Sequence, residues 1–244
     1  MASRAHAISF RRFAPGIVPL LFCLLFGGSV SAQTIVVPQE LPNLGKLELE
    51  LEDYHDCKGN HGCYTSDLDR QAGVATRALQ RAARMRKGES TRAAKLAVVL
   101  DIDETSLSNW EEIRQADFAY DAGAWNRWVD QASAPAIAGT LHFYEEAEKL
   151  GIAVFFITGR PESQRAATEK NLRSQGYTQW AGLVLRKPDQ AKTPTSIYKA
   201  AARQRIVAAG YRIAVNIGDQ MSDLTGSPRA DVSVKLADPF YYIP

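Results

Sequence analysis

The feature of this 244-residue sequence that most constrains its fold is a regular alternation of short apolar runs with amphipathic helical stretches. The apolar runs have the length and composition of strands buried on both faces, as in parallel sheets. The alternation predicts an α/β fold in which helices cover both faces of one parallel sheet. The expected strands cover residues 96–100, 152–157, 183–185, 213–217 and 232–234.

The helices between these strands have recognisable ends. We expect them to begin near Gly139, Pro161 and Pro194, because proline suits the first turn of a helix. A glycine, which readily takes the left-handed conformation that ends helices, follows each one. These glycines are Gly151, Gly176 and Gly210.

An N-terminal helical extension is predicted over residues 65–87, with Thr65 or Ser66 as its cap. It should pack on the main domain, whereas the preceding residues 33–64 show little periodicity. Its expected apolar face comprises Leu68, Gln71, Val74, Ala75, Ala78 and Ala82.

Three of the predicted strands are followed by polar residues. Ligands of open parallel sheets bind at the carboxyl edge of the strands, so these residues should surround one site. They are Asp101, Asp103, Glu104 and Thr105 after the first strand, Thr158, Gly159 and Arg160 after the second, and Gly218, Asp219 and Asp223 after the fourth.

These residue types are those that phosphoryl transfer through a covalent intermediate requires. Asp101 and Asp219 offer hard oxygen ligands to Mg²⁺, the backbone carbonyl of Asp103 offers a third, and Asp223 would hold a ligand water. Asp101 would attack phosphorus, while Asp103 would protonate the leaving group and then activate water. The expected substrate is a small-molecule phosphomonoester.

The phosphate oxygens need further partners. We expect Thr158, Gly159 and one lysine from the interval before the last motif to bind them. Lys187, Lys192 and Lys199 all lie in that interval. Lys199 is favoured because its surroundings fit the start of a helix, whereas the other two are typical of solvated loop charges.

Residues 106–138 interrupt the alternation and are rich in aromatic and charged side chains. We interpret them as a small, partly helical cap above the site. Single aromatic residues in such a segment more often pack than bind. Trp110, the nearest of them in sequence to the catalytic loop, is the candidate for stacking on a base or aryl group of a substrate.

The first 32 residues have the pattern of a signal peptide, with three arginines, a short apolar run over residues 17–26 and small residues before Ala32. The run is shorter than the about 20 residues that span a bilayer, although an uncleaved anchor is the alternative. Cleavage after Ala32 leaves 26 basic and 27 acidic residues, a net charge of −1 in place of +2. Neither a nucleic-acid polymer nor an anionic membrane is therefore an expected partner.

Five residues separate Cys57 from Cys63. In an oxidising compartment such a pair predicts a disulfide loop. A zinc site with His55 and His61 and a pair of free thiols are the alternatives. We expect a periplasmic or secreted protein, and the sequence leaves its oligomeric state open.

Three segments resemble the motifs of the haloacid dehalogenase (HAD) superfamily: residues 98–105 (VVLDIDET), 155–160 (FFITGR) and 216–224 (NIGDQMSDL). More narrowly, they are similar to the acid phosphatases of subfamily IIIB, which include bacterial class C acid phosphatases and plant vegetative storage proteins. The similarity extends from about residue 53 to the C-terminus. The ending at residues 234–239 (VKLADP) is close to the family's Lys-Leu-Pro-Asn-Pro but departs from it at two positions.

The resemblance implies a Rossmann-like fold with a modest cap, one phosphatase domain over residues 33–244, and Mg²⁺-dependent hydrolysis of phosphomonoesters, nucleotides included, at acidic pH. It assigns Asp101 as the nucleophile, Asp103 as the acid and base, and Thr158 as the hydroxyl of the second motif. Asp219 and Asp223 correspond to the metal-binding acids. Some plant storage relatives lack the nucleophile, which this chain retains.

Two other functions remain open: a catalytically quiet binding or storage protein of the same fold, and a phosphotransferase that passes the phosphoryl group to an alcohol. A mechanism through phosphohistidine is disfavoured, because none of the four histidines has the surroundings that it requires. The sequence does not identify the physiological substrate.

Overall fold

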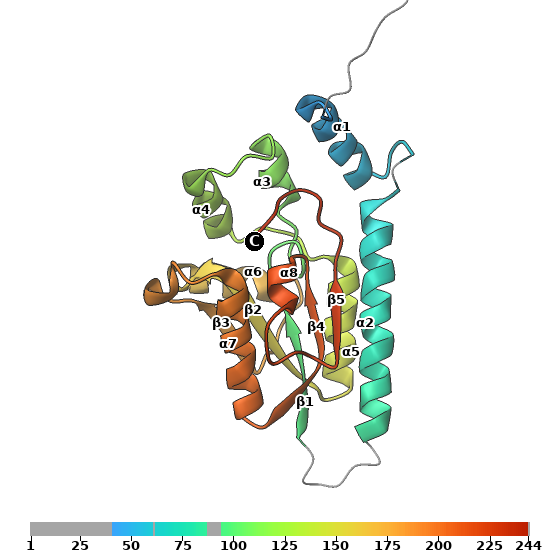
Figure 1. Ribbon diagram of the computed structural model, residues 1–244, viewed down its shortest axis with the longest axis vertical. Coiled ribbons are helices and arrows are strands. Elements are labelled where there is room, and N and C mark those ends of the chain that lie inside the picture. Colours follow the sequence, from blue (N-terminus) through green and yellow to red (C-terminus); the bar gives the residue numbers. More distant parts are fainter. Residues whose placement is uncertain (1–40, 61, 87–93, 244) are drawn as a thin grey trace, which may run out of the picture. The chain divides into compact units, whose positions relative to one another are not determined.

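The computed structural model describes residues 41–60, 62–86 and 94–243. The predicted signal peptide, His61 and Gly88 lie outside them. The described chain centres on one five-stranded sheet, all parallel, with the strand order β3-β2-β1-β4-β5 (Figure 1). All five predicted strands are confirmed: β1 (Lys95–Leu100), β2 (Ala153–Pro161), β3 (Gly182–Arg186), β4 (Tyr211–Gly218) and β5 (Val232–Lys235).

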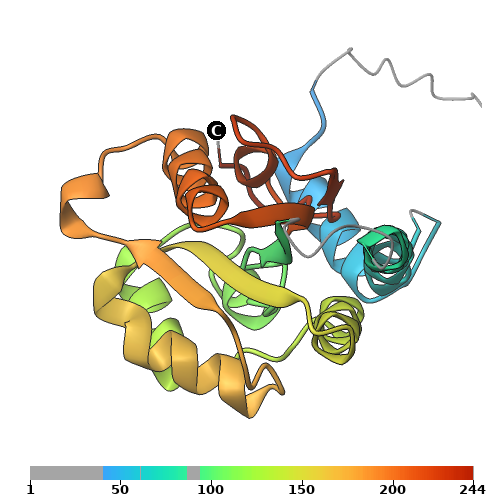
Figure 2. The same cartoon turned by 90° about the horizontal axis from the view of Figure 1, so that it is seen from below.

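Alternate residues of β1 point to opposite faces of the sheet, and each face has its own apolar core. Val98 and Leu100 belong to the larger cluster, which α2 (Tyr64–Arg86), α5 (Ala138–Lys149) and α6 (Arg165–Ser174) complete. Ala97 and Val99 belong to the other cluster, beneath α7 (Thr195–Ala208). Figure 2 shows the sheet between these two layers. The prediction of helices on both faces is confirmed.

The helix ends agree with the glycine pattern. Gly151, Gly176 and Gly210 follow α5, α6 and α7 with φ angles of +66°, +97° and +89°, which a residue with a Cβ rarely adopts. Pro161 and Pro194 stand one position earlier than expected. Pro161 ends β2 and precedes a 3₁₀ turn, η1 (Glu162–Gln164), while Pro194 is the N-cap of α7.

Helix α2 confirms the predicted N-terminal extension but corrects its apolar face. Val74 is 44% exposed, and Gln71, Ala78 and Ala82 are only partly buried. The buried residues follow a stripe of three- and four-residue steps, from which Val74 is turned away. That stripe comprises Tyr64, Leu68, Ala72, Ala75 and Leu79.

Helix α1 (Leu44–His55) was not predicted from the sequence. None of its residues is fully buried, and its leucines alternate with glutamates over residues 47–52, a period of two that does not indicate a helix. Its leucines and glutamates favour helix, and Asn43 caps it by accepting a hydrogen bond from the Lys46 N–H at 3.3 Å. A disulfide joins Cys57 to Cys63 in the turn that leads to α2, as predicted.

Two short helices, α3 (Trp110–Gln115) and α4 (Ala122–Gln131), lie between β1 and α5, in the segment interpreted as a cap. The remaining elements are η2 (Pro188–Gln190) and α8 (Met221–Leu224). Within the described part of the chain, no helix combines the length and apolar character needed to cross a membrane.

Candidate active site

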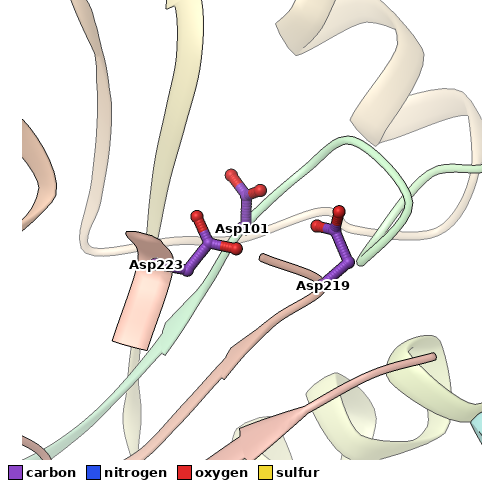
Figure 3. Close-up of side chains that lie close together, drawn as sticks. All are labelled: Asp101, Asp219 and Asp223. Carbon is purple, nitrogen blue, oxygen red and sulfur yellow. The ribbon is translucent and has the colours of Figure 1, made fainter. Parts of the chain in front are cut away.

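The carboxyl ends of three adjacent strands bring the predicted residues together. Leu100 of β1 pairs with Phe156 of β2 on one side and with Ile217 of β4 on the other. The segments that follow these residues therefore begin at one edge of the sheet. Asp101 leaves β1 there, Asp219 follows β4, and both carboxylates face the same space (Figure 3).

Three carboxylates form the centre of this site. Asp101, Asp219 and Asp223 are buried, and each offers an oxygen within 4.8 Å of those of the other two. Burial raises the pKa of both Asp101 and Asp219, and repulsion by Asp223 raises each further. Such a cluster becomes stable in its ionised form when a cation lies among the oxygens. A donor set made of carboxylates alone fits a hard divalent ion.

Lys199, on α7, supplies a fixed positive charge beside the cluster. Its ammonium nitrogen lies 2.6 Å from Asp101 Oδ1 and 2.5 Å from Asp223 Oδ1. Although burial alone would lower it, the pKa of Lys199 is raised by these two carboxylates, so the side chain stays charged. The other two candidate lysines, Lys187 and Lys192, are exposed on the segment before α7.

The position of Asp223 depends on Gly218 and on the backbone around it. A Cβ at Gly218 would overlap the side chain of Asp223. The Gln220 N–H donates to Asp223 Oδ2 at 2.9 Å. The backbone carbonyl of Asp223 accepts hydrogen bonds from Arg203 Nη1 at 2.5 Å and from Asn216 Nδ2 at 3.0 Å, and both donors are buried.

The C-terminal tail completes the surroundings of Asp219, which sequence reasoning did not anticipate. Tyr241 donates its hydroxyl to Asp219 Oδ2 at 3.2 Å, and Gln220 Nε2 donates to the same oxygen at 2.9 Å. Gln220 also reaches Asp238 Oδ2 at 2.7 Å, and Thr105 donates to Asp219 Oδ1 at 2.9 Å. Asp238 belongs to the Leu-Ala-Asp-Pro ending, the one signal in the sequence for this arrangement.

Asp103 lies apart from the three-carboxylate cluster and pairs with Arg160. Arg160 Nη2 approaches Asp103 Oδ1 at 2.6 Å, and Arg160 Nε donates to both carboxylate oxygens, at 3.0 and 3.2 Å. Asn109 Nδ2 adds a hydrogen bond to Oδ1 at 3.0 Å. Arg160 had been noted only as part of the Thr-Gly-Arg segment, and no signal in the sequence pointed to Asn109.

Thr158 and Gly159 have contrasting surroundings. Thr158 is fully buried, and its hydroxyl oxygen accepts the Arg160 N–H at 3.0 Å. Gly159 is exposed, and a Cβ built on it would meet nothing within 4 Å. Open space therefore lies above Gly159.

Trp110, the candidate for stacking on a substrate, already stacks within the protein. The His55 ring lies parallel to its indole, with centroids 3.8 Å apart and an interplanar angle of 8°. Phe118 and Phe240 pack around the same indole. At least one face of Trp110 is thus covered by the chain itself.

Comparisons with known proteins agree with this geometry. Residues 33–244 match the model of the HAD superfamily, subfamily IIIB (acid phosphatase). Acid phosphatase 1 of Solanum lycopersicum is 40% identical over 148 residues, which cover 59% of this chain and 58% of that protein. Vegetative storage protein 1 of Arabidopsis thaliana is 35% identical over 150 residues, which cover 60% and 55%. The alignments thus span less than two thirds of these relatives.

Among solved structures, the class C acid phosphatase from Bacillus anthracis superposes with a TM-score of 0.64. The superposition covers 82% of this chain and 86% of that structure at 22% sequence identity. At this identity the comparison establishes the likeness of the fold.

Proposed function

Because the chain belongs to subfamily IIIB of the HAD superfamily, the acid phosphatases, we propose that it hydrolyses phosphomonoesters through an aspartyl-phosphate intermediate. The single observation that carries this proposal is the meeting of Asp101, Asp219 and Asp223 with the buried ammonium group of Lys199. Burying so many charges costs free energy and does not help to stabilise a purely structural core. A site that binds a cation and a phosphate, by contrast, needs these charges.

In the first step an oxygen of Asp101 attacks phosphorus, and the bond to the leaving alkoxide breaks. Asp103 donates a proton to this alkoxide, which departs as an alcohol. In the second step Asp103 takes a proton from water. The water oxygen attacks phosphorus, the bond to Asp101 breaks, and inorganic phosphate leaves.

Lys199, Thr158 and Gly159 would bind the phosphoryl oxygens. The ammonium group of Lys199 is held in place by two carboxylates, so its charge needs no reorganisation when a phosphate arrives. The open space above Gly159 leaves room for a phosphoryl group.

We propose Mg²⁺ as the cation. Asp101 and Asp219 would bind it directly, with the backbone carbonyl of Asp103 as a further ligand and Asp223 acting through water. When bound, Mg²⁺ supplies positive charge that offsets the charges of the carboxylates and of the phosphoryl group.

We also propose that the protein is exported to the periplasm or secreted, with residues 1–32 as a cleaved signal peptide. The Cys57–Cys63 disulfide supports an oxidising compartment. Residues 33–244 would then form one phosphatase domain, with residues 106–138 as its cap. In support of this assignment, α3 and α4 lie beyond the carboxyl ends of the strands (Figure 1).

Hydrolysis of p-nitrophenyl phosphate by the purified chain, with EDTA and with added Mg²⁺, tests the proposal. We expect turnover that EDTA abolishes and Mg²⁺ restores, and that Asp101→Asn eliminates in both conditions. The variant shares the fold but lacks the nucleophile, so it also controls for a contaminating phosphatase. Equal rates for the wild type and Asp101→Asn would refute the assignment.

A quiet binding or storage protein is the second candidate, because the similar Arabidopsis thaliana proteins are named vegetative storage proteins. Retention of Asp101 and of its partner Lys199 favours the enzyme. A folded protein that binds Mg²⁺ but shows no turnover from acidic to neutral pH would reverse that preference.

A further inference from the structure

The two oxygens of the Asp103 carboxyl group have unequal surroundings. Oδ1 receives three hydrogen bonds, from Arg160 Nη2 at 2.6 Å, Arg160 Nε at 3.0 Å and Asn109 Nδ2 at 3.0 Å. Oδ2 receives one, from Arg160 Nε at 3.2 Å. An oxygen that already faces three N–H groups has no place for a proton of its own. Oδ2 is therefore the oxygen that can exchange a proton with a leaving group or with water.

Asn109 is one of the two residues that create this difference, and its amide group has only one sensible orientation. Its Nδ2 donates both to Asp103 Oδ1 and to Glu104 Oε2, the latter at 2.8 Å. A flipped amide would place its oxygen against two carboxylates. Its Oδ1 accepts the indole N–H of Trp128 at 2.8 Å. Since an indole nitrogen can only donate, Trp128 fixes which end of the amide faces Asp103.

We propose that Trp128 is a positioning residue, which acts through Asn109 to hold Asp103 with Oδ2 as the oxygen that has fewer hydrogen bonds. The inference rests on the proposed function, in which Asp103 transfers the proton. Trp128 lies on α4, and a second hydrogen bond, from Gln164 Nε2 to Asn126 Oδ1 at 2.8 Å, ties the same helix to the segment after β2. Trp128 thus acts on the acid through Asn109, which hydrogen-bonds to both of them.

Arg160 holds Asp103 from the other side and does not depend on Trp128. Its Nη1 donates to Thr168 Oγ1 on α6 at 3.2 Å. Loss of the Trp128 hydrogen bond therefore leaves the carboxyl group paired but removes the partner of the Asn109 amide oxygen, so the amide is held less rigidly. We expect proton transfer to suffer, while nucleophilic attack by Asp101 and phosphate binding continue.

Leaving groups of different basicity separate these effects. p-Nitrophenolate departs readily without a proton, whereas the more basic phenolate of phenyl phosphate benefits from one. The two esters are similar in shape, and kcat/KM reports on the steps up to departure of the leaving group. In Trp128→Phe, which removes the N–H and retains a ring, kcat/KM for phenyl phosphate should fall about tenfold and that for p-nitrophenyl phosphate less than about twofold.

Trp125→Phe is the matched control. Trp125 lies on the same helix, and its indole nitrogen donates to none of the residues that the structure describes. The ratio of the two kcat/KM values in Trp125→Phe should therefore equal that of the wild type. The ratio is measured within each sample, so a partly unfolded preparation does not alter it. Asn109→Ala should shift the ratio at least as far, and adding Trp128→Phe to it should cause no further shift.

Equal losses on both esters, an unchanged ratio in Trp128→Phe, or the same shift in Trp125→Phe would overturn the positioning role while leaving the phosphatase intact. A wild-type protein that hydrolyses neither ester would refute the proposed function, and this inference with it.

Discussion

Replacing Lys199 with methionine tests how the acid cluster is held. The side chain is 3% exposed, and its ammonium nitrogen lies 2.6 Å from Asp101 Oδ1 and 2.5 Å from Asp223 Oδ1. Methionine keeps most of the volume but removes the charge. Two buried carboxylates then lose their cation, so the folded state should become less stable whenever no metal is bound.

Removal of one partner of a buried ion pair costs about 3–5 kcal/mol. Two features place this site near the lower end of that range. Burial already raises the pKa of Asp101, so this carboxyl takes up a proton readily when Lys199 is absent. Asp223 keeps the hydrogen bond from the Gln220 N–H. We expect a loss of about 3 kcal/mol near neutral pH in EDTA, which lowers Tm by about 6–12 °C in a chain of this size.

The loss should depend on pH. Because the folded-state pKa of Asp101 is raised above its unfolded value, its stabilising contribution is complete below the unfolded pKa of about 4 and disappears as the pH rises through the folded pKa. Removal of Lys199 raises the folded pKa further. The stability of Lys199→Met should therefore be closest to that of the wild type at acidic pH and should differ from it most near neutral pH.

Thermal unfolding followed by circular dichroism, in EDTA and in saturating Mg²⁺, measures these effects. Mg²⁺ should restore more stability to Lys199→Met than to the wild type, because the ion replaces the missing positive charge. Exposed Lys192 provides the control, since Lys192→Met should change stability by less than about 0.5 kcal/mol. A Tm for Lys199→Met within about 2 °C of the wild type, in EDTA at neutral pH, would show that the ion pair does not hold the cluster.

Three further predictions follow from the same geometry. Gly218→Ala places a methyl group where the Asp223 side chain lies. We expect it to lower the free energy of unfolding in urea by about 1–3 kcal/mol and to weaken Mg²⁺ binding measured by calorimetry. An unchanged Mg²⁺ affinity would contradict the overlap. Burial raises the pKa of Asp101 and Asp219, so cation binding must displace protons: Mg²⁺ affinity should rise from acidic to neutral pH, and a flat profile would show that the carboxylates ionise without help. Leu79 on α2 is fully buried, so Leu79→Ala should lower the free energy of unfolding by about 2–5 kcal/mol, whereas Val74→Ala at an exposed position should lower it by less than about 0.5 kcal/mol. Similar losses for the two variants would mean that the extension does not fold with the core.

The strands and the centre of the site were predictable because regular secondary structure repeats at fixed intervals along the sequence. The alternation of apolar and helical stretches gave the parallel sheet, and a parallel sheet places the residues after each strand at one edge. Asp101 and Asp219 meet for that reason, and Asp223 joins them from α8, where Gly218 leaves room for its side chain. Helix α1 escaped prediction because none of its residues is fully buried and its leucines alternate with glutamates over residues 47–52, which is not the helical period.

Asn109, one of the partners of Asp103, was beyond this reasoning because it follows irregular backbone. Between β1 and α5, four residues other than glycine have positive φ angles: Glu104, Asp117, Phe118 and Ala132. Glu104 lies between the end of β1 and Asn109, and its positive φ angle interrupts the regular repeat that would predict side-chain directions. Whether Asn109 faces Asp103 or solvent therefore cannot be predicted from its position in the sequence relative to the end of β1.

The same difference predicts how substitutions should act in the two parts of the site. The three clustered carboxylates follow the strands of a sheet with a core on each face, so a change in the cap segment should leave their positions nearly unchanged. Asp103, by contrast, is held by Arg160 and Asn109, and those residues are held in turn by Thr168 and Trp128. Single hydrogen bonds join Trp128 to Asn109 and Thr168 to Arg160, so losing either one should loosen the acid. Proton transfer should therefore be more sensitive than metal binding to changes in the cap segment.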